Sequence, residues 1–254
     1  MQPTSPHPTL DRPAKGHVFI VAFGRSGSTL TQKLLNALPG YCIRGENANA
    51  LANLCRTAIL LSREPVYGQL RALELAGPDG QAQWQGNRIE RRGWFANMGA
   101  PDHPWYGIEA VDASAFARDL FEVFARTVLR PPDGTRVAGC KEIRWATEPA
   151  IFHESLDLVS AAFPGTRFIF QNRDFEHVRR SSFWKEADAG AVKAMWDTHE
   201  RLTAEYLARR DNGFRLDHRV FREGPDALGP LFGFLGEPFD RRLVESVLDT
   251  HLTH

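Results

Sequence analysis

The chain has 254 residues, 43% of them hydrophobic, and its 31 Lys and Arg side chains balance 31 Asp and Glu side chains. A net charge of zero excludes a global electrostatic field that would attract nucleic acid or an anionic membrane, so any anionic ligand must be held by local basic residues. The sparse cysteines Cys42, Cys55 and Cys140 exclude a disulfide framework and a cysteine-rich zinc site.

Residues 1–16 are polar and rich in proline, which predicts a flexible tail before the first strand. They lack the apolar core of a signal peptide, and no later apolar run is long enough to span a bilayer. We therefore expect a cytoplasmic protein without an integral membrane segment. The histidines are scattered without metal-ligand spacing, so we expect no metal site.

An apolar run over residues 17–23 predicts a buried parallel strand, and residues 24–29 form a Gly- and Ser-rich turn before a helix over 30–38. Such a turn binds phosphate because backbone N–H groups and the helix N-terminus face the anion. The glycines permit the tight backbone, and the remaining loop residues supply hydroxyl donors and one cation. Those candidate anion ligands are Arg25, Ser26, Gly27, Ser28 and Thr29.

The loop lacks the pattern of ATP-dependent kinases, G-x-x-x-x-G-K-[ST], because Ser28 rather than Lys follows Gly27. Arg25 is the cation of this loop, and a sulfuryl group carries less charge than a phosphoryl group. Cationic side chains are therefore sufficient to stabilise its transfer without a metal. A small-molecule kinase and an unoccupied turn between strand and helix remain alternatives.

The remaining elements alternate between strands and helices. Further strands are expected over residues 41–44, 136–140, 167–170 and 214–221. Further helices are expected over residues 48–62, 114–129, 149–163, after 174, and over 226–235 and 240–252. This order predicts a single α/β domain over 17–254 with a central parallel sheet covered on both faces. Residues 63–112 are irregular and rich in Gly, Pro and aromatic residues, which indicates a helical or irregular insert.

A second basic segment follows the 167–170 strand. Arg173 ends this strand, and Asp174 is expected to cap the helix that begins at Phe175. Ser181 is expected about two helical turns further on, from where it and Arg173 would reach one anion. Taken alone, Arg173 and its neighbours equally fit a solvated basic face.

Together, the two segments resemble the sulfotransferase superfamily that uses 3′-phosphoadenosine 5′-phosphosulfate (PAPS). Residues 24–29 are similar to its 5′-phosphosulfate loop, residues 173–181 to its 3′-phosphate motif, and residues 231–240 to its C-terminal helix and turn. The resemblance covers most of residues 17–250 and is weakest over 63–112. It implies a P-loop-like fold and a reaction that yields a sulfate ester and 3′-phosphoadenosine 5′-phosphate (PAP).

The resemblance also implies roles for matched residues. The loop ligands, Arg25 and residues 26–29, would hold the 5′-phosphosulfate, and Arg173 and Ser181 the 3′-phosphate. Phe175 stands where the family often has Pro, and the Arg-Lys-Gly clamp of hormone-type members is missing. The remaining 3′-phosphate contacts and the adenine contacts are therefore unassigned.

Transfer to a hydroxyl needs a base for its proton and cations for the leaving oxygen. No Lys-Thr-His segment is present, but residues 45–47 resemble the Gly-Glu turn of tyrosylprotein and bacterial carbohydrate sulfotransferases, whose Glu is the base. Glu46 is thus the expected base, with stabilisation of a helix N-terminus as the alternative. Lys141, at a strand end, is the expected second cation. We expect Glu142 to be structural and Arg144 to contact the substrate.

The acceptor is expected to be a small molecule or a glycan. Aromatic residues between 63 and 112, expected to contact it, are Trp84, Trp94, Trp105 and Tyr106. A core role within the insert fits these rings equally well. A Glu base favours a carbohydrate or glycolipid hydroxyl over a phenolic, steroid-like molecule. A non-catalytic nucleotide-binding protein is a further alternative, and the sequence indicates no oligomeric state.

Overall fold

A computed structural model of the protein describes residues 10, 13–63, 101–102, 106–107, 110–181 and 183–249. The chain divides into two compact units, residues 1–55 with 120–254 and residues 56–119. Most of the expected insert lies outside the described residues, so the division into a tail and a single domain with an insert stays a prediction. No helix in the described ranges is long and apolar enough to cross a bilayer.

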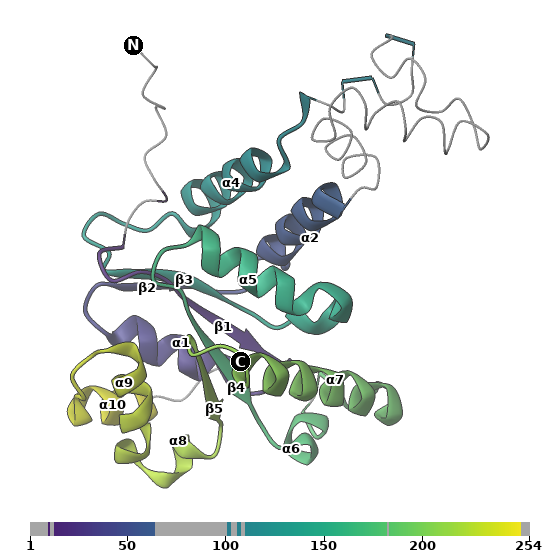
Figure 1. The fold of residues 1–254 in the computed structure, drawn as a ribbon. Helices are drawn as coiled ribbons and strands as arrows, with labels where there is room; N and C mark the ends of the chain where they lie inside the picture. The colour runs from purple at the N-terminus through teal and green to yellow at the C-terminus, as the bar shows by residue number, and fades with distance from the viewer. Residues whose placement is uncertain are drawn as a thin grey trace. The chain divides into compact units, whose positions relative to one another are not determined.

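The larger unit is built on a sheet of five parallel strands in the order β2-β3-β1-β4-β5 (Figure 1). The strands are β1 (Val18–Ala22), β2 (Tyr41–Arg44), β3 (Val137–Glu142), β4 (Arg167–Asn172) and β5 (Gly213–Asp217). Every residue of the central strand β1 is buried, as expected for an apolar strand covered on both faces. The predicted α/β fold with a central parallel sheet flanked by helices is therefore confirmed.

Helices cover both faces of this sheet because successive side chains of each strand point to opposite sides. Val18 and Ile20 enter a core with α1 (Ser28–Ala37), α9 (Gly229–Leu235) and α10 (Arg241–Leu248). On the other face lie α5 (Phe152–Ala162) and α7 (Ala189–Leu207) (Figure 1). The aromatic pairs there include Phe19–Phe163, Phe168–Tyr206 and Phe170–Tyr206, with ring centroids 5.4, 5.6 and 5.4 Å apart. The sheet is thus fixed on both sides, and its carboxyl edge remains for a ligand.

Most predicted elements are present, with shifted ends. Helix α2 covers Ala50–Arg63, and α4 covers Ala113–Phe124 before a π-helical segment at Ala125–Leu129. The predicted strand over 214–221 is wrong in its second half, because β5 ends at Asp217 and α8 covers Val220–Glu223. The apolar residues of that half, Val220 and Phe221, pack from a helix onto the α1 side of the sheet. In so short an apolar segment, the hydrophobic pattern does not distinguish a strand from a helix.

The helix after Asp174 is shorter than expected. Asp174 caps it as predicted, accepting hydrogen bonds from the backbone N–H groups of Glu176 and His177. However, α6 covers only Phe175–Arg179, and Ser181 lies beyond it in a turn in which Trp184 N–H donates to the Ser181 carbonyl at 3.1 Å. The expectation that Ser181 lies two turns along this helix is therefore wrong.

Two buried histidines make the stability of the fold sensitive to acid. Burial lowers the pKa of both His17 and His199 to about 4 from 6.5. Between those values the unfolded chain binds protons that the folded chain does not, so the free energy of unfolding should fall as the pH falls. The loss from pH 7 to pH 5 is about 2 kcal/mol for each histidine. Urea unfolding at both pH values measures it, and a His199→Gln variant with the same loss as the wild type would contradict this origin.

Candidate active site

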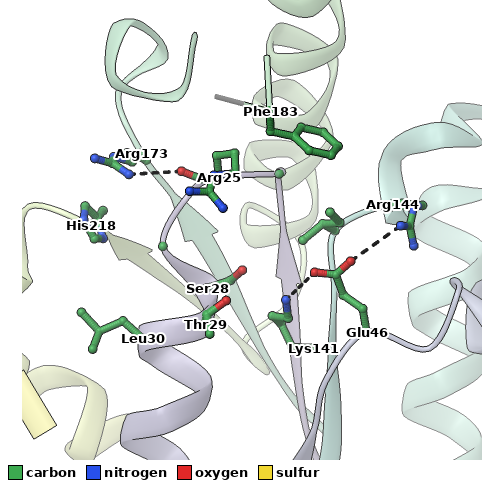
Figure 2. A pocket seen from close by; sticks show the side chains of 13 residues that line it. Arg25, Ser28, Thr29, Leu30, Glu46, Lys141, Arg144, Arg173, Phe183 and His218 are labelled. Atoms are coloured by element: carbon green, nitrogen blue, oxygen red, sulfur yellow. Dashed lines mark hydrogen bonds and ion pairs between the residues drawn. The ribbon is translucent and has the colours of Figure 1, made fainter. Parts of the chain in front are cut away.

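A cavity of about 310 Å³ opens at the carboxyl edge of the sheet (Figure 2). Its lining residues come from the end of β3, the start of α1, the loops that follow all five strands and the turn after α6. They are Gly24, Arg25, Gly27, Ser28, Thr29, Leu30, Glu46, Lys141, Ile143, Arg144, Arg173, Phe183 and His218. All the predicted loop ligands except Ser26 therefore border one space with the expected base, Lys141, Arg144 and Arg173.

The loop after β1 has the backbone of an anion site. Arg25 and Gly27 have φ angles of 70° and 90°, a left-handed conformation that turns successive N–H groups to one side of the chain. Helix α1 begins at the next residue and has no acidic side chain in its first turn. A Cβ atom at position 27 would lie 2.3 Å from Nδ1 of His218, so only glycine fits. The N-terminus of α1 thus faces the cavity with its positive partial charge unopposed within that turn.

The second basic segment is fastened to this loop. Arg173 donates to the carbonyl of Arg25 at 3.3 Å, although 148 positions separate them. The indole N–H groups of Trp184 and Trp196 donate to the carbonyls of Gly24 and Arg173 at 3.1 and 3.2 Å. The two motifs that the sequence singled out therefore form one continuous surface, in which α6 and α7 hold Arg173 beside the loop.

Several polar atoms of the loop and of the second basic segment are buried without a protein partner. They include Ser26 Oγ, Arg173 Nε and Ser181 Oγ, and Nδ1 of the cavity residue His218 is in the same condition. Buried polar groups are nearly always hydrogen-bonded in folded proteins, so unpaired ones next to a cavity indicate a missing ligand. Ser181 is not among the described lining residues of the cavity, but its unpaired hydroxyl belongs to this group.

His218 and Arg222 are residues that the sequence analysis missed. Both line a second cavity of about 470 Å³ that shares Arg173 with the first. Burial, then Arg222, then Arg25 lower the pKa of Arg173, and burial, then Arg173, then Arg222 lower that of His218 to about 4. Neighbouring Arg side chains thus add to the effect of burial on both groups, and His218 is neutral at pH 7. The sequence signal for His218 was its position directly after a strand, where ligand-binding residues of parallel sheets lie. The predicted strand over 214–221 was too long, so His218 was placed inside it.

Opposite Arg173, the expected base and the second cation form an ion pair (Figure 2). Nζ of Lys141 lies 2.5 Å from Oε1 of Glu46, and Arg144 approaches the other carboxylate oxygen at 3.6 Å. The Lys141 side chain is 7% exposed, whereas that of Glu46 is 34% exposed and reaches the cavity. The side chain of Asn47, not of Glu46, accepts from the first N–H group of α2. The Glu46 carboxylate is therefore turned toward Lys141.

Fewer of the residues expected to contact the acceptor lie in the described part of the chain. Trp94 and Trp105, like Trp84, lie outside the described residues, and Tyr106 lies 56% exposed in a turn of the smaller unit. The cavity has apolar lining that the sequence analysis did not identify, namely Leu30, Ile143 and the 62% exposed ring of Phe183. The sequence signal that Phe183 lines the cavity was its position, two residues after the expected phosphate ligand Ser181.

A model described as the sulfotransferase family matches residues 17–223. No curated protein matches the sequence. Among solved structures, the chain is similar to the sulfotransferase domain of an olefin synthase from Synechococcus PCC 7002, with a TM-score of 0.50 and 17% identity over 93% of this chain and 78% of that one. It is also similar to sulfotransferase STF9 from Mycobacterium avium (TM-score 0.47, 14% identity, 94% and 68% covered). At 17% identity, the likeness to the olefin synthase domain shows the fold alone.

Proposed function

We propose that this chain, which belongs to the sulfotransferase family, transfers a sulfuryl group from PAPS to an acceptor hydroxyl. One observation carries the proposal: the two basic motifs meet at a cavity that also contains a carboxylate. The described lining of that cavity includes the cations Arg25, Lys141, Arg144 and Arg173 against the single carboxylate of Glu46. This excess of positive charge suits a polyanionic donor with a neutral acceptor.

The donor would span the cavity from the loop to Arg173. Its 5′-phosphosulfate would contact Arg25 and the N-terminus of α1, where Gly27, Ser28 and Thr29 supply N–H groups and hydroxyls. Ser26 donates its N–H to the Phe23 carbonyl, so its proposed contact is through the hydroxyl, which has no protein partner. Its 3′-phosphate would accept from Arg173 and Ser181, whose buried Nε and Oγ have no protein partner. Arg222 lines the second cavity, which Arg173 also lines. Its guanidinium would supply a cation to the 3′-phosphate in place of the Arg-Lys-Gly clamp that this sequence lacks.

In the transfer, a bond forms between the acceptor oxygen and sulfur while the bond from sulfur to the 5′-phosphate oxygen breaks. Glu46 takes the proton of the acceptor hydroxyl as this bond forms. Lys141 and Arg25 stabilise the negative charge that develops on the leaving oxygen. The close pair of Lys141 and Glu46 supports these roles, because it holds both groups where the acceptor and the leaving group would meet.

The acceptor we propose is a carbohydrate or glycolipid hydroxyl, contacted by Arg144. The roles expected for Trp94, Trp105 and Tyr106 stay predictions. Support comes from the resemblance of residues 45–47 to the Gly-Glu turn of bacterial carbohydrate sulfotransferases, whose base is a Glu. The apolar surface of the Phe183 ring also suits stacking on the C–H face of a sugar ring. A cytoplasmic location likewise stays a proposal. The kinase alternative lacks support, because the matching family transfers sulfuryl groups.

Thermal unfolding with nucleotides tests the donor assignment. A ligand that binds only the folded state stabilises it by about 2.7 kcal/mol at a hundredfold excess over Kd, which corresponds to roughly 5–10 °C in Tm for a chain of this size. PAP should produce this shift, whereas AMP and ATP, which lack the 3′-phosphate, should produce much less. Arg173→Ala should remove the preference for PAP, and Arg179→Ala, on the exposed surface of α6, should keep it. Equal shifts from all three nucleotides would contradict the assignment.

A further inference from the structure

We infer that Glu142 is a positioning residue: its buried carboxylate fixes the loop that carries Glu46 and shares Arg144 with it, and so orients the proposed base. The inference rests on the proposed function. Glu142 is 2% exposed and is not among the described lining residues of the cavity, whereas its neighbour Lys141 is. Adjacent residues of a strand point to opposite faces, so Glu142 acts on the site through other residues.

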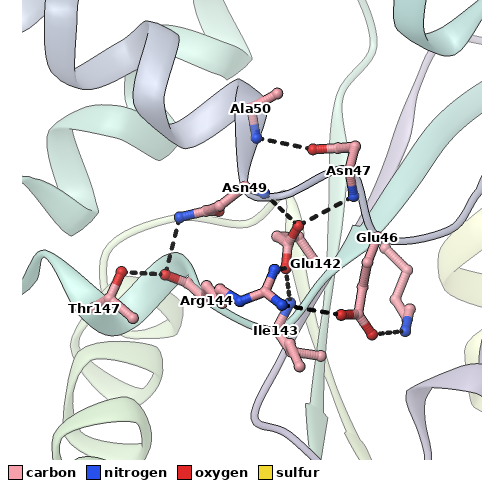
Figure 3. A network of polar contacts seen from close by, with 9 residues as sticks. Glu46, Asn47, Asn49, Ala50, Glu142, Ile143, Arg144 and Thr147 are labelled. Atoms are coloured by element: carbon pink, nitrogen blue, oxygen red, sulfur yellow. Dashed lines mark hydrogen bonds and ion pairs between the residues drawn. The ribbon is translucent and has the colours of Figure 1, made fainter.

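One oxygen of Glu142 binds the loop between β2 and α2 (Figure 3). Oε2 accepts from the backbone N–H groups of Asn47 and Asn49 at 3.3 and 2.7 Å. The backbone at Ala48, between them, is unfavourable by itself, because its φ angle of 58° is left-handed and a residue with a Cβ atom disfavours that region. Asn49, with a φ angle of 59°, is of a residue type that adopts it more readily. The carboxylate therefore holds in place a turn that the local sequence does not favour, directly after Glu46.

The other oxygen determines how Arg144 approaches the base. Oε1 accepts from the backbone N–H of Ile143 at 2.8 Å and from NH1 of Arg144 at 3.2 Å. The other guanidinium nitrogen, NH2, faces Oε2 of Glu46 at 3.6 Å (Figure 3). Arg144 thus lies between two carboxylates and is bound more closely by the one that is outside the cavity. Without the charge of Glu142, the Arg144 guanidinium would have Glu46 as its one remaining carboxylate partner in this network. It would then compete with the acceptor hydroxyl for the Glu46 carboxylate.

The backbone of Arg144 is held as well. Its carbonyl oxygen accepts from Nδ2 of Asn49 at 3.1 Å and from the hydroxyl of Thr147 at 2.7 Å. The loop after β2 and the loop after β3 are therefore joined twice, once through Glu142 and once through Asn49. This arrangement fixes the distance between Lys141 on β3 and Glu46, which lie 95 positions apart.

Two measurements on Glu142→Gln test the inference. A Gln amide replaces one of the two accepting oxygens by an NH₂ donor, and in either orientation this donor faces N–H groups that Glu142 binds, so the loop should loosen. Exchange of the Asn49 amide hydrogen should become about tenfold faster or more, without any donor or acceptor present. The kcat for sulfuryl transfer should fall about 10- to 100-fold, as expected for a displaced catalytic group, with KM for PAPS and the affinity for PAP nearly unchanged.

A matched control is available at the opposite edge of the sheet. The Glu237 side chain is 5% exposed and accepts from both Lys15 and Arg136, so Glu237→Gln loses a similarly buried ion-pair network far from the cavity. This variant should lose stability but keep kcat and the exchange rate of Asn49. If Glu142→Gln does not fold, Glu142→Asp keeps the charge, withdraws it from the loop by one methylene, and is measured in the same way.

A double-mutant cycle with Glu46→Gln separates the possible outcomes. If Glu142 acts through Glu46, adding Glu142→Gln to Glu46→Gln should cause little further loss of kcat. Unchanged exchange of Asn49 in the single variant, or a full further loss of kcat in the double variant, would overturn the positioning role. Wild-type protein that binds PAP but transfers no sulfuryl group would instead overturn the proposed function, and the exchange measurement would still decide whether Glu142 holds the loop.

Discussion

Replacing Glu46 by Gln should lower kcat by about 10²–10⁴-fold, the usual contribution of a general base. The substitution keeps the size and hydrogen bonding of the side chain but removes the charge that accepts the proton. Affinity for PAP should change little, because the proposed donor contacts, the loop and Arg173, lie across the cavity from Glu46. Steady-state kinetics with an identified acceptor, together with PAP titration, would measure both quantities.

Glu245→Gln is the matched control for this prediction, because it makes the same change on the exposed surface of α10. It should leave kcat as in the wild type. If Glu46 only stabilised the N-terminus of α2, Glu46→Gln would cost about 0.3–1 kcal/mol of stability and leave turnover near normal. That result would exclude Glu46 as the base and remove the main support for a carbohydrate-type acceptor.

Lys141→Ala and Arg25→Ala should each lower kcat by about 10²-fold or more. Both remove positive charge beside the proposed leaving oxygen, where it stabilises the transition state more than the bound donor. Lys141→Ala has a second effect, because Lys141 lies 2.5 Å from Glu46 and its loss leaves the carboxylate with Arg144 as its remaining ion-pair partner among the described residues. We therefore expect the larger loss for Lys141→Ala. Single-turnover kinetics with saturating PAPS measure the chemical step directly.

The control for these variants is Arg201→Ala, which removes a cation from the surface of α7, where Arg201 pairs with Glu205. It should keep the kcat and KM of the wild type. Losses confined to KM in Lys141→Ala or Arg25→Ala would show that these cations bind the ground state only. In that case the proposed stabilisation of the leaving oxygen would be wrong.

The sequence was sufficient for those parts of the fold and site in which the determinants are close together in the chain. The loop over residues 24–29 follows a buried strand and begins a helix, so its conformation and the anion site that we propose there depend on adjacent residues. The cap of α6 at Asp174 is local in the same way. The alternation of strands and helices likewise predicted the parallel sheet, because parallel neighbours need a crossover between them.

Only the tertiary structure decided which of these segments meet. The strand order joins Arg173 to the carbonyl of Arg25 and Lys141 to Glu46, and no local pattern specifies such pairs. Tertiary packing also overrode the strand propensity of residues 218–221, ending β5 at Asp217 and bringing His218 against Gly27. It likewise made Glu142, which the sequence indicated only as structural, the acceptor for a strained turn from another strand. The physical reason is that burial and hydrogen bonding between distant segments depend on the packed sheet, whereas turn, cap and strand preferences are properties of neighbouring residues.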